Sequence, residues 1–134
     1  MEKKRILIID DESTFTRMVR LNLEKTGRFE VREENAAANG LTAAREFKPD
    51  LILLDVLMPS MDGGDVKAQI RRNRNLKTVP IIFLTATISA SESGNRGPSG
   101  SDGLFISKPV SAERLIQIID ENLPPEEVKL PPVV

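Results

Sequence analysis

Three short, uninterrupted runs of apolar residues constrain the fold of this chain more than any other feature. They cover residues 6–9, 51–54 and 81–84 and consist of Ile, Leu and Phe. Runs that do not alternate apolar with polar side chains are typical of strands buried on both faces of a parallel sheet. Residues 29–32 alternate, which predicts a strand with one more exposed face, and residues 104–106 form a fifth, short candidate.

Between these runs the apolar residues recur with helical periodicity. The expected helices cover residues 13–25, 35–47, 65–73 and 111–123. Asn35 and Ser111 are suitable N-terminal caps, and the Gly63-Gly64 pair is expected to delay the third helix until residue 65. The side chains expected on the inner face of the first helix are Phe15, Met18, Val19 and Leu23.

Strands that alternate with helices predict an α/β domain, in which right-handed crossovers cover both faces of a five-stranded parallel sheet. We expect this domain to span residues 1–123. Residues 89–103 are rich in serine and glycine, so the fourth helix of the pattern is expected to be short, frayed or replaced by a loop. Residues 124–134 contain four prolines and are interpreted as a tail or linker stub.

The composition excludes several kinds of site. The chain has no cysteine and no histidine, so it has no thiol nucleophile, no thiolate metal site and no histidine general base. Its net charge of −1 argues against direct, sequence-independent binding to nucleic acid. No apolar run approaches the roughly 20 residues that span a bilayer, so a soluble, cytoplasmic protein without membrane association is expected.

Polar residues follow four of the five predicted strands. Asp10 and Asp11 follow the first, Asp55 ends the third, Thr85 ends the fourth, and Lys108 follows the fifth. Taken singly, these are turn-forming acids, a β-prone threonine and a solvated lysine. Together at one edge of a parallel sheet, the carboxylates favour Mg²⁺, and the lysine and hydroxyl suit a tetrahedral anion. The combination predicts phosphoryl transfer onto a carboxylate.

The motifs around these residues resemble those of two-component response-regulator receiver domains. Residues 49–63 (PDLILLDVLMPSMDG) resemble the phosphoacceptor segment, and residues 8–12 (IIDDE) resemble the acidic pair. Residues 84–86 (LTA) resemble the hydroxyl strand, and residues 107–110 (SKPV) the lysine-proline signature. The resemblance covers residues 4–123 and implies a doubly wound, flavodoxin-like sheet with the strand order 2-1-3-4-5.

The resemblance also implies a role for each of these residues. Asp55 would be the phosphoacceptor, and Lys108 and Thr85 would bind the phosphoryl oxygens. Thr85 and Phe105 would form the conformational switch, and the bond before Pro109 would be cis. The implied Mg²⁺ ligands are Asp10, Asp11, Asp55 and the backbone carbonyl of Leu57.

The implied partner is a sensor histidine kinase or a histidine phosphotransfer protein, because this chain has no histidine of its own to act as donor. Such a protein promotes only its own phosphorylation and slow dephosphorylation, so it is not expected to be an enzyme, and it would be a monomer or weak dimer. Two alternatives stay open. One is a degenerate receiver that docks to partners without accepting phosphate. The other is a haloacid-dehalogenase-like phosphatase, although Leu57 stands where that family has a second aspartate.

Overall fold

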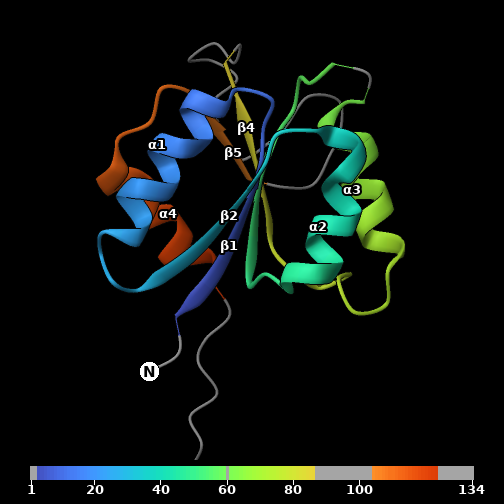
Figure 1. Ribbon diagram of the computed structural model, residues 1–134, viewed down its shortest axis with the longest axis horizontal. Helices are drawn as coiled ribbons and strands as arrows, with labels where there is room; N and C mark the ends of the chain where they lie inside the picture. Colours follow the sequence, from blue (N-terminus) through green and yellow to red (C-terminus); the bar gives the residue numbers. More distant parts are fainter. Residues whose placement is uncertain (1–2, 60, 87–103, 124–134) are drawn as a thin grey trace, which may run out of the picture.

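A five-stranded sheet lies between two layers of helices in the computed structural model, which describes residues 3–59, 61–86 and 104–123 (Figure 1). The strands are β1 (Lys4–Ile9), β2 (Phe29–Glu34), β3 (Leu51–Asp55), β4 (Ile81–Thr85) and β5 (Leu104–Ser107). The helices are α1 (Ser13–Glu24), α2 (Gly40–Phe47), α3 (Gly63–Arg72) and α4 (Ala112–Asn122), with a short 3-10 helix, η1 (Ala37–Asn39), before α2.

All neighbouring strands are parallel, and their order is β2-β1-β3-β4-β5, which confirms the predicted fold class. The chain steps outward from β1 to β2 and then returns past β1 to β3. The strand order therefore reverses between β1 and β3, and the crevice at the carboxyl ends of these strands is where such sheets usually bind ligands.

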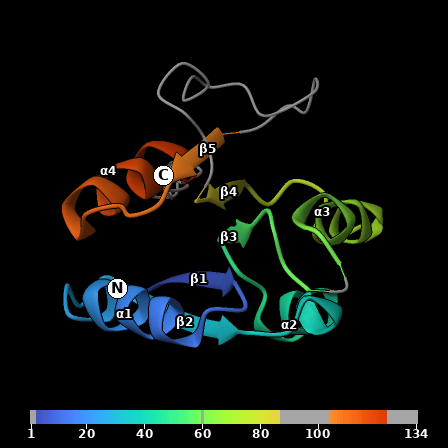
Figure 2. The same ribbon diagram turned by 90° about the horizontal axis from the view of Figure 1, so that it is seen from above.

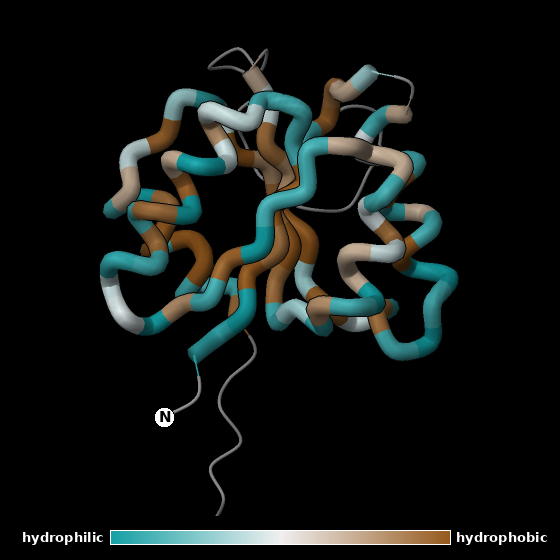
Figure 3. The backbone as a smooth tube through the Cα atoms, in the orientation of Figure 1, coloured by the Kyte–Doolittle hydropathy of each residue, from teal (hydrophilic) through white to brown (hydrophobic). Residues whose placement is uncertain are grey.

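Each face of the sheet has its own apolar core, because neighbouring residues of a strand point to opposite faces. Ile6 and Ile8 pack with α1 and α4, whereas Leu7 and Ile9 pack with α2 and α3. Figure 2 shows these two helical layers on opposite sides of the sheet, and Figure 3 shows that apolar residues concentrate along the strands. β1 and β3 are buried on both faces, as their solid apolar runs predict.

Two predicted helix starts are wrong. α3 begins at Gly63 rather than at residue 65, because the Asp62 side chain accepts a 2.9 Å hydrogen bond from the Asp65 backbone N–H and caps the helix. Asn35 caps no helix, since α2 begins only at Gly40 and the Asn35 side chain donates a hydrogen bond to the Asp10 carbonyl oxygen instead. Ser111 caps α4 as predicted, through a hydrogen bond from the Arg114 N–H.

The inner face of α1 also differs from the prediction. Val19 and Leu23 are buried, and Thr16 completes their stripe. Met18 was expected to face the core but is 47% exposed, because it lies about 100° around the helix from Val19. Leu21 is 59% exposed on the same helix, so α1 presents apolar side chains to solvent.

Two of the predictions concern residues that the structure does not describe. Residues 89–103, where the irregular fourth unit is expected, and the tail 124–134 lie outside the described residues. Among the helices that the structure does describe, none combines the length and the apolar character needed to cross a membrane.

Gly63 provides a test of how closely α3 approaches the end of β3. A Cβ atom at Gly63 would lie 2.5 Å from the Asp55 carbonyl oxygen, whereas one at Gly64 would meet only the Asp62 Oδ1 atom, at 3.2 Å. We expect Gly63→Ala to lower the free energy of unfolding by about 2 kcal/mol, because backbone atoms must shift. Gly64→Ala should leave it unchanged or raise it by up to about 1 kcal/mol, because alanine favours a helix. Urea denaturation measures both, and equal effects of the two substitutions would contradict the packing described.

Candidate functional site

Three carboxylates meet at the carboxyl edge of the sheet. Asp10 follows β1, Asp11 follows Asp10, and Asp55 is the last residue of β3. One oxygen from each lies within 4.8 Å of the others. Asp10 is fully buried and Asp55 is 5% exposed, whereas Asp11 is exposed. Two of the three negative charges are therefore largely removed from water.

Lys108 reaches this cluster from the residue after β5. Its Nζ atom lies 2.6 Å from Asp10 Oδ2, 3.1 Å from Glu12 Oε1 and 3.8 Å from Asp55 Oδ1. Burial opposes the charged form of Lys108, but the carboxylates of Asp10 and Glu12 outweigh burial and raise its pKa. The lysine is thus a permanent cation within the acidic cluster.

Asp55 carries the most perturbed carboxyl group of the site. Burial and the negative charge of Asp10 raise its pKa from 3.8 to about 7, against the opposing effect of Lys108. Close approach of carboxylates in a low dielectric disfavours simultaneous ionisation unless more positive charge is supplied. The cluster therefore holds more carboxylates than the single Lys108 ammonium can balance.

The donor set fits a magnesium ion. Asp10 Oδ2 is buried, and its partner is the Lys108 ammonium, 2.6 Å away, which is also shared with Glu12 and Asp55. The candidate ligand atoms are carboxylate oxygens, which hard divalent cations prefer. Asp11 is exposed, so water molecules could complete the coordination of an ion. Asp10, Asp11 and Asp55 could therefore hold Mg²⁺. Leu57 lies in the loop after β3, and because a leucine side chain has no donor atom, only its backbone carbonyl could contribute.

The other predicted site residues lie at the same edge of the sheet or next to it. Thr85 ends β4, is 4% exposed, and its carbonyl oxygen accepts a 2.8 Å hydrogen bond from the Lys108 N–H. Phe105 is half-buried on β5 and its ring stacks on Phe83, with 4.9 Å between the ring centroids. The Lys108–Pro109 peptide bond is cis.

The residues that hold the Asp10 turn in place by hydrogen bonds were not predicted from the sequence. The Asn35 side chain donates hydrogen bonds to the Asp10 carbonyl oxygen, at 2.8 Å, and to Thr16 Oγ1, at 3.0 Å. Thr16 is fully buried and hydrogen-bonds to Glu33 Oε1 at 2.7 Å. This network joins the end of β2 to the turn that carries Asp10. The signal available in the sequence was a threonine on the apolar face of a helix, where a buried hydroxyl needs a partner.

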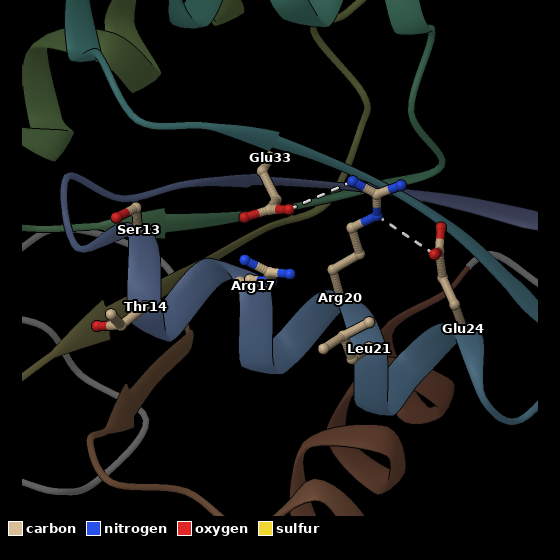
Figure 4. A pocket seen from close by; sticks show the side chains of 7 residues that line it. All are labelled: Ser13, Thr14, Arg17, Arg20, Leu21, Glu24 and Glu33. Atoms are coloured by element: carbon tan, nitrogen blue, oxygen red, sulfur yellow. Dashed lines mark hydrogen bonds and ion pairs between the residues drawn. The ribbon is translucent and has the colours of Figure 1, made fainter.

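A pocket lies along α1 and does not include the three clustered aspartates (Figure 4). It is lined by Ser13, Thr14, Arg17, Arg20, Leu21, Glu24 and Glu33. The Arg20 guanidinium pairs with Glu24 at 3.2 Å and with Glu33 at 3.4 Å, as the dashed lines show. Arg17 and Arg20 together balance the charges of Glu24 and Glu33, so the pocket has no excess of one charge comparable with that at the acidic edge.

The raised pKa of Asp55 predicts a pH-dependent effect of Asp55→Asn on stability. The folded protein holds the Asp55 proton up to about pH 7, whereas the unfolded chain releases it near pH 3.8. Stability without divalent cations should therefore fall as the pH rises from about 4 to about 7. We expect Asp55→Asn to be more stable than the unsubstituted protein by up to about 4 kcal/mol at pH 8, and the difference to shrink toward pH 4.

Denaturation in EDTA at several pH values measures this difference. Asp120→Asn is the control, because it removes a carboxylate that pairs with Arg28 far from the cluster. Saturating Mg²⁺ should stabilise the unsubstituted protein by about 2.7 kcal/mol at 100 times its Kd, and Asp55→Asn much less. A pH-independent difference would show that burial does not raise the pKa of Asp55.

Comparison with known proteins agrees with this geometry. The family model for the response regulator receiver domain matches residues 6–120. The DNA-binding dual master transcriptional regulator RpaA of Synechocystis is 33% identical over 112 residues, which are 84% of this chain and 46% of RpaA. Protein PilH of Pseudomonas aeruginosa is 30% identical over 119 residues, covering 89% of this chain and 97% of PilH.

Solved structures give the same result. The Vibrio cholerae chemotaxis protein CheY4 superimposes with a TM-score of 0.78 at 27% identity, over 91% of this chain and all of CheY4. The chain spans about half the length of several of its curated relatives, including RpaA at 46% and the MtrA regulator of Mycobacterium leprae at 52%. The family match and the acidic edge lead to one conclusion: this chain belongs to the response regulator receiver domain family of two-component signalling.

Proposed function

We propose that Asp55 accepts a phosphoryl group from a phosphohistidine on a partner protein and that the phosphorylated chain then binds its targets differently. The main support is the meeting of Asp10, Asp11 and Asp55 with Lys108 at one largely buried edge, where a single ammonium faces several carboxylates. Mg²⁺ would be held by these three carboxylates and by the Leu57 backbone carbonyl. We place the reaction in the cytoplasm.

In the proposed transfer, a carboxylate oxygen of Asp55 forms a bond to phosphorus as the bond between phosphorus and the histidine nitrogen breaks. The imidazole leaves with the electron pair, and Asp55 becomes an acyl phosphate. The reacting carboxylate must be ionised, and its pKa of about 7 in the absence of metal means that added positive charge favours the reactive form. When bound, Mg²⁺ supplies this charge and neutralises the phosphoryl oxygens.

Lys108 and Thr85 are proposed to receive the transferred group. The Lys108 ammonium already lies 3.8 Å from Asp55 Oδ1, so a small shift would let it pair with a phosphoryl oxygen. Thr85 ends the neighbouring strand and would donate its hydroxyl to another oxygen. Since positioning and charge neutralisation provide most of the acceleration in phosphoryl transfer, these fixed groups suffice without an acid or base on the chain.

The proposed switch connects Thr85 with Phe105. Movement of Thr85 toward the phosphoryl group would change the packing at the end of β4, beside β5. Phe105 is half-buried against Phe83 on the edge strand β5, so its ring can shift between this stack and the exposed edge of the sheet. Such a shift would change the face that partners contact.

A histidine kinase or histidine phosphotransfer protein is the proposed donor. Met18 and Leu21 give α1, the helix that follows the acidic turn, an exposed apolar surface, and apolar side chains occur at the centre of docking surfaces. The chain would act as a signalling protein that modifies only itself. The phosphatase alternative loses support because Leu57, at the acid/base position of that family, exposes an apolar side chain.

Incubation with acetyl phosphate and Mg²⁺, followed by intact-mass measurement, tests the proposal. We expect a mass gain of one phosphoryl group that disappears in Asp55→Asn and in EDTA. Lys108→Ala should slow the gain by about tenfold to 100-fold, because one preorganised charge is lost. Asp65→Asn, on the exposed first turn of α3, is the matched control and should react normally.

Two outcomes would contradict phosphorylation of Asp55. Absence of any mass gain in the unsubstituted protein would favour a docking receiver. Repeated turnover of phosphate esters without a mass gain would favour a phosphatase.

A further inference from the structure

The aromatic ring of Phe15 lies against the Lys108 ammonium group. Lys108 Nζ is 4.5 Å from the centroid of this ring, within the range of a cation–π interaction. The Lys108 side chain is only 9% exposed, so little water screens the contact. The ammonium therefore has carboxylates of Asp10 and Glu12 as charged neighbours and the face of Phe15 as a neutral one.

The position of the ring is fixed by the first turn of α1. The backbone N–H groups of Phe15 and Thr16 both donate to the Glu12 carbonyl oxygen, at 3.1 and 3.0 Å. Thr16 is in turn hydrogen-bonded by Asn35, which also donates to the Asp10 carbonyl oxygen. The residue that contacts the ammonium is thus tied to the turn that carries the carboxylates.

The packing of Phe15 does not by itself require an aromatic side chain. Phe15 is only half-buried and contacts the core between the sheet and α1 and α4 from its edge. A leucine could make these apolar contacts, because they depend on volume and not on a π system. An aromatic face is needed only for the ammonium.

We propose that Phe15 is a positioning residue for phosphoryl transfer, which holds the Lys108 ammonium beside Asp55 without competing for its hydrogen bonds. A lysine has several rotatable bonds, and confining its ammonium before reaction reduces the entropy that must be lost later. Asp10 and Glu12 also confine it, but as anions they compete with an incoming phosphoryl group. The ring attracts the ammonium while leaving its N–H donors available.

The contact can be tested on the metal-free protein, without any phosphodonor. A ring at this distance should shift the NMR signals of the Lys108 ε-methylene protons upfield. We expect this shift to disappear in Phe15→Leu and to persist in Phe15→Tyr, which keeps the aromatic face. Phe47→Leu is the matched control, because it removes a half-buried ring that lies under Arg5, 5.6 Å from the guanidinium carbon.

The kinetic consequence rests on the proposed function. With acetyl phosphate and Mg²⁺, Phe15→Leu should be phosphorylated about threefold to tenfold more slowly than the unsubstituted protein. Phe15→Tyr and Phe47→Leu should stay within about twofold of it. The stabilisation by Mg²⁺ should be unchanged in Phe15→Leu, since the ring holds the lysine and not the ion.

Each measurement can overturn the inference independently of the proposed function. Unshifted ε-methylene signals in the unsubstituted protein would exclude the contact, whether or not Asp55 is phosphorylated. Equal phosphorylation rates for Phe15→Leu and the unsubstituted protein would show that the contact does not assist transfer. Failure of every variant and of the unsubstituted protein to gain mass would instead count against the proposed function and leave the NMR result as the test of the contact.

Discussion

The buried negative charge at one edge of the sheet is the constraint on which the rest of the site depends. Asp10 and Asp55 are almost fully removed from water, and Lys108 is the cation that lies between them. In a low dielectric, such a group must take up a proton, bind a metal ion or remain strained. The raised pKa of Asp55 corresponds to the first solution, and the clustered oxygens of Asp10, Asp11 and Asp55 would allow the second. A proton and a metal ion would therefore compete for the same cluster.

A doubly covered parallel sheet can sustain this charge because the strands beneath it are rigid. β1 and β3 lie side by side in the centre of the sheet and are apolar on both faces, so their carboxyl ends cannot move apart without disrupting both cores. Gly63 brings α3 against the Asp55 carbonyl group, which further restricts the end of β3. The apolar cores thus keep the carboxylates of Asp10 and Asp55 close together although they repel each other.

The fold and the charged edge could be predicted from patterns within single strands and helices. Contacts between distant segments could not be predicted in this way. Solid apolar runs identify β1, β3 and β4, and their ends identify Asp10, Asp55 and Thr85. Periodicity also assigned Met18 and Phe15 to the core, although Met18 is 47% exposed and Phe15 contacts the Lys108 ammonium as well as the core. Lys108 and Glu12 are 96 residues apart, and no periodic pattern can show that they pair. Asn35 resembled a helix cap because that role is local, whereas its observed partners lie on other elements.

The arrangement around Lys108 also explains how a local reaction could reach the rest of the molecule. Its side chain is shared among several carboxylates and a ring, so a change of partner would exchange one ion pair for another and need little energy. Its backbone N–H donates to the Thr85 carbonyl oxygen, which joins the ends of β5 and β4. A displacement of either residue would therefore be felt by the other through a hydrogen bond. Phe105 stands three residues before Lys108 and stacks on Phe83 of β4, so Thr85, Lys108 and the aromatic pair all lie on or directly after the same two strands.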